Sequence, residues 1–186
     1  MLLWLDGKDV GEVSGIWKDK SGNGNDMTLF NTDNLIISDG MVQFSGTVGG
    51  GMESYGYSSI DLIDKSFTVL LEGVFPNSFK CGGTHSQTIY LNVMPKKMAI
   101  FRKGKSFEPD YANVFNGIDP HKIVISHNKD TKECLVFVDN VQVASGTLDS
   151  MCSSICRFGL GSNYGGGTYY KMGVSQLKIY DTVINV

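Results

Sequence analysis

The segment KIVISHNKDTKECLVFVDNVQVA, residues 122–144, decides the fold class. Two apolar runs flank a polar five-residue stretch, NKDTK, and this pattern predicts a β-hairpin. The dipeptide Asp139-Asn140 then turns the chain into a third apolar run, because Asp and Asn tolerate the backbone conformations of short turns. The expected strands are Lys122–His127, Glu133–Val138 and Val141–Ala144.

The same period of two continues along the rest of the chain. The longest run, Ser66–Phe75, is rich in β-branched and aromatic residues and ends at Pro76. A turn at Ser58–Ile63 is the best helical candidate. Many short antiparallel strands predict an all-β protein, a two-sheet sandwich or barrel whose first and last strands lie side by side. Further strands are expected at Met41–Phe44, Thr88–Val93, Lys97–Arg102, Arg157–Gly161 and Gly173–Tyr180.

The composition suits one globular domain spanning residues 1–186 and argues against several functions. The chain is 41% hydrophobic and 11% aromatic, and its 23 glycines against 4 prolines favour short strands joined by tight turns. The net charge of -3, without a Lys/Arg cluster, offers no electrostatic basis for binding nucleic acid. No apolar run is long enough to span a bilayer. We therefore expect no nucleic-acid partner and no membrane insertion.

The N-terminal residues Met1–Asp6 lack a basic segment, a long apolar segment and a cleavage site, so no signal peptide is expected. The protein would then stay in the compartment where it is made, leave by lysis within a particle, or be cut from a longer chain. The four cysteines could pair, but reduced thiols are the expectation for the set, and the spacing of the last two matches no standard zinc site. Cys134 falls in an apolar run and is expected to be a buried free thiol. The four cysteines are Cys81, Cys134, Cys152 and Cys156.

The segment Trp17–Asp26, WKDKSGNGND, is the most distinctive loop of the chain, because carboxylates and side-chain amides alternate with glycines. Two interpretations stay open. The loop could bind calcium, which prefers carboxylate, amide and carbonyl oxygens. Alternatively, the same side chains could hold the loop together by hydrogen bonds to its backbone. The candidate calcium ligands are Asp19, Asn23, Asn25 and Asp26.

Aromatic side chains in glycine-rich stretches are the candidates for ligand contacts. A sugar site combines an aromatic platform with amides or carboxylates, and tyrosines on loops suit sugar or protein contacts equally well. Ordinary packing is the alternative for each of them. The candidate binding residues are Tyr55, Tyr57, Tyr111, Asn163, Tyr164, Tyr169 and Tyr170.

An ordered set of motifs resembles the laminin G-like, or concanavalin A-like, lectin/glucanase superfamily. The resemblance implies a concanavalin A-like jelly roll of two antiparallel sheets, in a family whose members bind sugars, proteins or calcium and include some glycosidases. The motifs span nearly the full length of the chain. They are LWLDG (3–7), the loop WKDKSGNGND (17–26), DGMVQFSG (39–46), SFTV (66–69), FVDNVQV (137–143) and GVSQLKIY (173–180).

The chain lacks the paired acids that a glycosidase of this fold would use. One carboxyl group would protonate the leaving group while a second attacks or activates water, and the glucanase branch carries these groups as E-x-D-x-E. No such run is present, and no nucleophile elbow is found. We therefore expect a protein that is not an enzyme. The scattered acidic residues are Glu53, Asp61, Asp64 and Glu72.

Two functions are consistent with these features. The first is a carbohydrate-recognition module for adhesion, displayed on a larger assembly such as a bacteriophage virion, with a glycan or cell-surface ligand as partner. The second is a structural or decoration protein of a virus particle, such as a capsid component, that contacts virion proteins. Either is compatible with a homo-oligomer, and both predict a location at the virion surface.

Overall fold

The computed structural model describes residues 1–10, 15–46, 55–82, 90–94, 97–102, 105–107, 114–148, 155–162 and 170–184. Regular structure in these ranges consists of strands and two short 3-10 helices, η1 (Gly7–Asp9) and η2 (Thr32–Asn34). No helix in these ranges is long and apolar enough to cross a membrane. The strands are β1 (Leu3–Asp6), β2 (Ile16–Trp17), β3 (Met27–Phe30), β4 (Leu35–Ser38), β5 (Met41–Phe44), β6 (Tyr55–Ile60), β7 (Phe67–Val74), β8 (Phe79–Gly82), β9 (Tyr90–Met94), β10 (Lys97–Arg102), β11 (Lys105–Phe107), β12 (Pro120–His127), β13 (Glu133–Val138), β14 (Val141–Thr147), β15 (Cys156–Leu160) and β16 (Met172–Tyr180).

One layer is an eight-stranded antiparallel sheet in the order β14-β13-β12-β7-β16-β5-β4, with β1 also paired to β16. β1 and β5 follow each other along the same edge of β16, whose other edge pairs with β7. Leu3 lies opposite Ile179, so the first and last strands are neighbours, as the sequence predicts.

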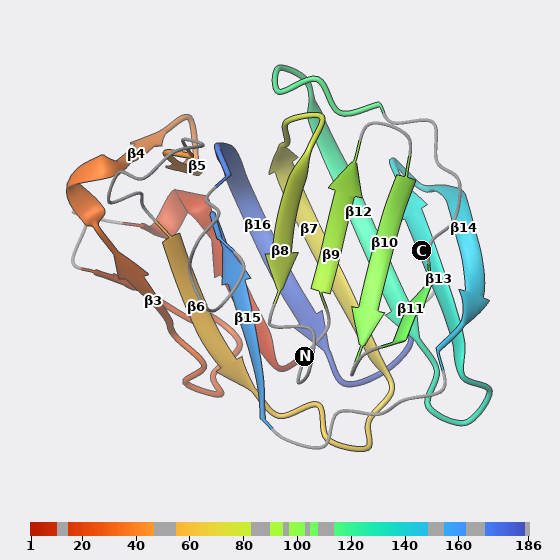
Figure 1. The fold of residues 1–186 in the computed structure, drawn as a ribbon. Helices are drawn as coiled ribbons and strands as arrows, with labels where there is room; N and C mark the ends of the chain where they lie inside the picture. The colour runs from red at the N-terminus through yellow and green to blue at the C-terminus, as the bar shows by residue number, and fades with distance from the viewer. Residues whose placement is uncertain are drawn as a thin grey trace.

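The second layer consists of two four-stranded antiparallel sheets, ordered β11-β10-β9-β8 and β15-β6-β3-β2. The edge strands β15 and β8 of these two sheets lie beside each other. Figure 1 shows β8, β9 and β10 in front of β7, β12 and β16 of the large sheet. The protein is therefore an all-β, two-layer antiparallel sandwich of jelly-roll type, which confirms the predicted fold class.

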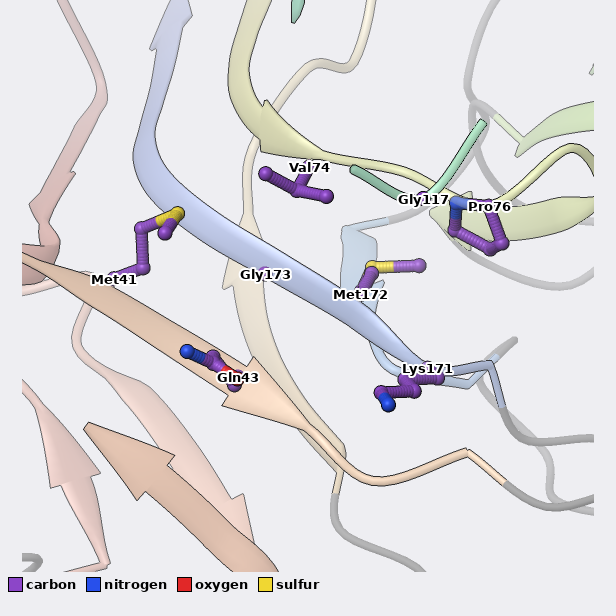
Figure 2. Close-up of a pocket in the computed structure, with 8 residues that line it drawn as sticks. All are labelled: Met41, Gln43, Val74, Pro76, Gly117, Lys171, Met172 and Gly173. Carbon is purple, nitrogen blue, oxygen red and sulfur yellow. The ribbon is translucent and has the colours of Figure 1, made fainter. Parts of the chain in front are cut away.

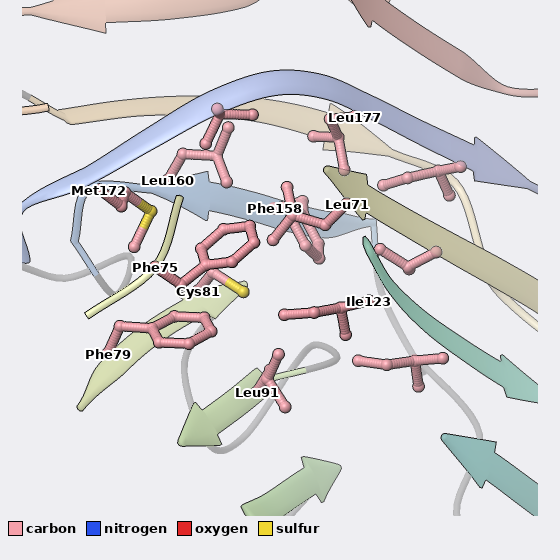
Figure 3. Close-up of a cluster of buried hydrophobic side chains, with 14 of the residues drawn as sticks. Leu71, Phe75, Phe79, Cys81, Leu91, Ile123, Phe158, Leu160, Met172 and Leu177 are labelled. Carbon is pink, nitrogen blue, oxygen red and sulfur yellow. The ribbon is translucent and has the colours of Figure 1, made fainter. Parts of the chain in front are cut away.

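The core lies between the two layers, where alternate side chains of facing strands meet (Figure 3). Leu71 of β7 lies in register with Ile123 of β12 and Leu177 of β16, and all three are buried. Phe79 and Leu91 contribute buried side chains from the opposite layer. Complete burial of a side chain of this size stabilises the fold by about 1.5–3 kcal/mol.

Among the described residues, Cys81 and Cys134 are buried and form no disulfide. The prediction of a buried thiol outside any disulfide at Cys134 is confirmed. Burial raises the pKa of the Cys81 thiol from 9.0 to about 12, because a thiolate is poorly solvated in the core. Cys152 lies outside the described residues.

The turn between β13 and β14 has the backbone conformation that its sequence predicts. Asp139 and Asn140 both have positive φ, 52° and 65°, as a type I′ turn requires at its two central positions. β5, β10 and β13 have the predicted bounds.

The predicted helical turn at Ser58–Ile63 is wrong, because residues 58–60 belong to β6. β6 pairs with β3 on one side and with β15 on the other, so its backbone groups are engaged in the sheet. Ser58 and Ile60 are buried while Ser59 is exposed, which is the period of two that a strand requires.

Candidate functional site

The loop between β2 and β3 covers the free edge of β1. The backbone amide of Trp4 donates to Asp19 Oδ1 over 2.9 Å, and the amide of Lys20 donates to the Trp4 carbonyl over 2.8 Å. The indole Nε1 of Trp17 donates to the carbonyl of Asp6 over 3.0 Å. β1 pairs with β16 along its other edge. The loop therefore supplies hydrogen-bond partners to backbone groups on an edge of β1 that would otherwise be open.

Asp19 is the centre of this loop. Its Oδ1 accepts from the amides of Trp4 and Ser21, and its Oδ2 accepts from the Ser21 hydroxyl and the Asn25 amide, all within 2.9 Å. An ionised carboxylate has about four lone-pair positions, so its accepting capacity is filled. Partial burial raises the pKa of Asp19, but these hydrogen bonds together lower it more, so the pKa lies below the ordinary 3.8.

The other three predicted calcium ligands also take part in the loop's hydrogen bonds. Asp26 Oδ1 accepts from the Asp19 amide at 2.8 Å and Oδ2 from Lys18 Nζ at 2.7 Å, and these bonds lower its pKa. The Nδ2 groups of Asn23 and Asn25 donate to the carbonyls of Met1 and Leu2, over 2.9 and 2.8 Å. The structure thus brings all four residues together around the N-terminal strand.

These contacts fit a calcium site only in part, because the lone pairs of Asp19 are taken by internal donors. Within the described ranges no group of three or more His, Cys, Asp or Glu side chains could hold a metal ion. Calcium binding stays a prediction that this arrangement does not test, and the contacts favour the role in holding the loop.

Thermal unfolding with and without calcium tests the loop. A calcium site saturated 100-fold above its Kd would stabilise the fold by about 2.7 kcal/mol, or roughly 5–10 °C in Tm for a chain of this size. Because Asp19 is saturated, we expect the Tm in 5 mM calcium and in EDTA to agree within about 1 °C. A rise of several degrees, lost in the variant Asp26→Asn, would show that the loop is a calcium site after all.

Two of the predicted binding residues, Tyr55 and Tyr57, lie on the same face of β6 and stack on Phe30 of β3. The ring centroids are 4.7 Å apart for Phe30–Tyr55 and 5.3 Å for Phe30–Tyr57, with interplanar angles of 10° and 18°. Their neighbours Gly56 and Ser58 are buried, so the three half-buried rings lie on the outer face of the second layer. We call Phe30, Tyr55 and Tyr57 the aromatic stack.

The other aromatic candidates are placed differently. Tyr170 is partly buried against the core, and its amide donates to the carbonyl of Gly161 over 2.7 Å. It lies just before β16 in the chain, and its partner Gly161 directly follows β15, the strand that pairs with β6. The remaining predicted binding residues, Tyr111, Asn163, Tyr164 and Tyr169, lie outside the described residues.

A groove of about 220 Å³ lies on the large sheet, where β16 runs between β5 and β7 (Figure 2). Gly173 pairs with Gln43 of β5 and with Val74 of β7, so the three residues share one face of the sheet. Neighbouring residues Val42, Phe44, Met172 and Val174 are buried in the core, and this face is therefore the outer one. No sequence pattern predicts this groove, because its residues come from three different strands.

The floor of the groove is open because Gly173 has no side chain. A Cβ atom at this position would lie 3.5 Å from Met41 Sδ, 3.7 Å from Gln43 Cγ and 3.9 Å from Val74 Cβ, which are ordinary contact distances. Figure 2 shows Met41 and Gln43 on one side of β16, Val74 and Pro76 on the other, and Lys171 at one end.

No family model matches this sequence, and no curated protein matches it significantly. Its fold does match solved structures. The sialidase of Trypanosoma rangeli in complex with sialic acid has a TM-score of 0.69 and 14% identity, over 98% of this chain and 31% of the sialidase. The binding domain of botulinum neurotoxin DC in complex with SialylT has a TM-score of 0.71 and 7% identity, over 99% of this chain and 48% of that one.

A smaller protein matches over a shorter stretch. The CBM40 of Ruminococcus gnavus IT-sialidase, bound to alpha2,3 sialyllactose, has a TM-score of 0.51 and 11% identity, over 65% of this chain and 78% of that module. This chain thus spans less than half the length of the sialidase and toxin chains. At these identities the likeness shows that the chain shares its β-sandwich fold with these three proteins.

Proposed function

We propose that this chain is a non-catalytic glycan-binding module of the concanavalin A-like or laminin G-like superfamily. The observation that carries the proposal is the aromatic stack, which sets three half-buried rings on the outer face of the second layer. The C–H groups of a sugar ring pack well against the electron-rich face of an aromatic side chain. Two solved structures with the same fold add support, because one is in complex with sialic acid and the other is bound to alpha2,3 sialyllactose.

The arrangement of acidic residues supports a role without catalysis. Most glycosidases use two carboxyl groups facing one bond, about 5–9.5 Å apart. Glu72 is the acidic residue of the central strand β7, and its in-register neighbours are Lys122 on β12 and Gln176 on β16. The residues paired with Glu72 therefore supply no second carboxylate.

The proposal also includes display on a larger assembly such as a bacteriophage particle. This part of the proposal rests on the sequence alone. Antibody labelling of purified particles would test it, and labelling confined to the soluble fraction of a lysate would contradict it.

A glycan array probed with the purified protein, followed by calorimetry on the best ligand, tests the binding function. We expect Tyr55→Ala with Tyr57→Ala to weaken that binding by about tenfold or more, since aromatic contacts of this kind contribute about 0.5–1.5 kcal/mol each. Tyr180→Ala, on the large sheet, serves as the matched control and should leave the affinity unchanged. An array without hits would refute the glycan-binding proposal, and unchanged affinity in the double variant would place the site elsewhere.

A further inference from the structure

The groove over Gly173 combines three kinds of surface that suit an acidic sugar. Val74, Pro76 and Met41 offer apolar contacts on both sides of its floor. Gln43 Nε2 donates to Ser38 Oγ over 2.8 Å, which leaves Gln43 Oε1 to accept a hydrogen bond from a ligand. Lys171 is exposed at one end of the groove.

Within the described part of the chain, no acidic side chain neutralises the charge at this end. Lys171 forms no ion pair with any residue in the described part of the chain. The acidic residue on the same face of β7, Glu72, lies directly across from Lys122 on β12. The ammonium group of Lys171, beside the apolar floor of the groove, can therefore pair with an anionic ligand, although the net charge of the protein is -3.

We propose that this groove binds the carboxylate-bearing terminal sugar of an acidic glycan. The inference rests on the proposed glycan-binding function and adds the class of sugar and a second site. The carboxylate pairs with Lys171, a hydroxyl or amide N–H donates to Gln43, and the C–H face of the ring packs over Gly173 and Val74.

The size of the groove agrees with one sugar ring. Sites that enclose a drug-sized ligand measure roughly 300–1,000 Å³, and this groove measures about 220 Å³. The groove and the aromatic stack lie on the outer faces of opposite layers, so one sugar cannot contact both. Substitutions can therefore test the two sites separately.

Titration of the protein with alpha2,3-sialyllactose and with lactose, followed by NMR and calorimetry, tests the proposal. We expect sialyllactose to bind more tightly than lactose, and its affinity to fall as salt is raised, because salt screens the exposed charge. Lys171→Gln should weaken sialyllactose binding by about fivefold to tenfold, as expected for one charge-assisted contact. Gly173→Val should abolish it, because the new side chain fills the floor.

Lys129→Gln is the matched control, because Lys129 lies beside Ser66, just before β7, whereas the groove lies at Val74 where that strand ends. It removes the same charge and should leave binding unchanged. Lys171 is exposed, so its substitution should not affect folding, which makes Lys171→Gln decisive even if Gly173→Val unfolds. The proposal is wrong if sialyllactose binds no better than lactose, or if Lys171→Gln binds it as the wild type does.

These outcomes separate the two proposals. Hits on neutral glycans that are lost in the Tyr55/Tyr57 variant, without binding of sialyllactose, would overturn the groove proposal and support the aromatic stack. Binding of sialyllactose that depends on Tyr55 and Tyr57 instead of Lys171 would likewise overturn it. An array without hits and no binding of sialyllactose would refute both.

Discussion

Replacing Gly73 with alanine is expected to destabilise the protein by about 3 kcal/mol or more. Gly73 lies on β7 where the backbone of β16 approaches closely, next to the irregular register between Val174 and Gln176. A Cβ atom at Gly73 would overlap the carbonyl oxygen of Gly173 and lie 3.0 Å from the Cα atom of Val174. Both obstacles are backbone atoms of a central strand, so the two strands would have to separate.

The neighbouring Gly173 provides a matched control, because it belongs to the same strand pair and its added Cβ would meet only side chains at 3.5–3.9 Å. Gly173→Ala should therefore change the free energy of unfolding by less than about 1 kcal/mol. Urea denaturation of both variants, with the midpoint and slope compared, measures the difference. Equal stability of the two variants would show that the close approach at Gly73 does not limit the packing of β7 on β16.

Removal of the Asp19 side chain should have the second largest effect, a loss of about 2–4 kcal/mol. Asp19→Ala leaves the amides of Trp4, Ser21 and Asn25 without their acceptor and releases the loop from the edge of β1. A loss of this size lowers the Tm by roughly 4–16 °C in a chain of this length. Asp130→Ala is the matched control, because Asp130 is an exposed carboxylate in a hairpin loop.

The stability that Asp19 contributes should depend on pH with a defined sign. Its pKa in the folded protein lies below 3.8, so this stability is present above pH 3.8 and is lost as the pH falls through the lowered value. Acid unfolding of the wild type should therefore lose more free energy below pH 3.8 than acid unfolding of Asp19→Ala. Parallel pH profiles for the two proteins would show that the hydrogen bonds of Asp19 do not lower its pKa.

The strands that sequence analysis predicts well are those whose pattern is local. The runs that form β7, β12 and β13 are long and apolar. The residue types of Asp139 and Asn140 by themselves indicate a turn with positive φ. β6 was predicted poorly, because Gly56, Ser58 and Ser59 carry little apolar signal and their conformation depends on pairing with β3 and β15. In such segments tertiary contacts decide the structure.

The candidate sites follow the same rule. Tyr55 and Tyr57 are separated by one residue, so a strand places them on one face, but their partner Phe30 comes from another strand and has no sequence signal that links it to them. The groove could not be predicted from the sequence for a related reason. Gln43, Val74 and Gly173 meet only because β5 and β7 flank β16. A single glycine in a strand does not by itself indicate a groove.

The pairing of β1 with β16 brings the beginning and the end of the sandwich to one place. The Leu2 amide donates to the Ile179 carbonyl over 2.7 Å, and the Met1 amino group lies 3.7 Å from Asp181 Oδ1. A polypeptide can therefore enter and leave this sandwich through neighbouring points. Domains whose two ends lie close together tolerate insertion into a loop of another protein, so this geometry suits such an insertion.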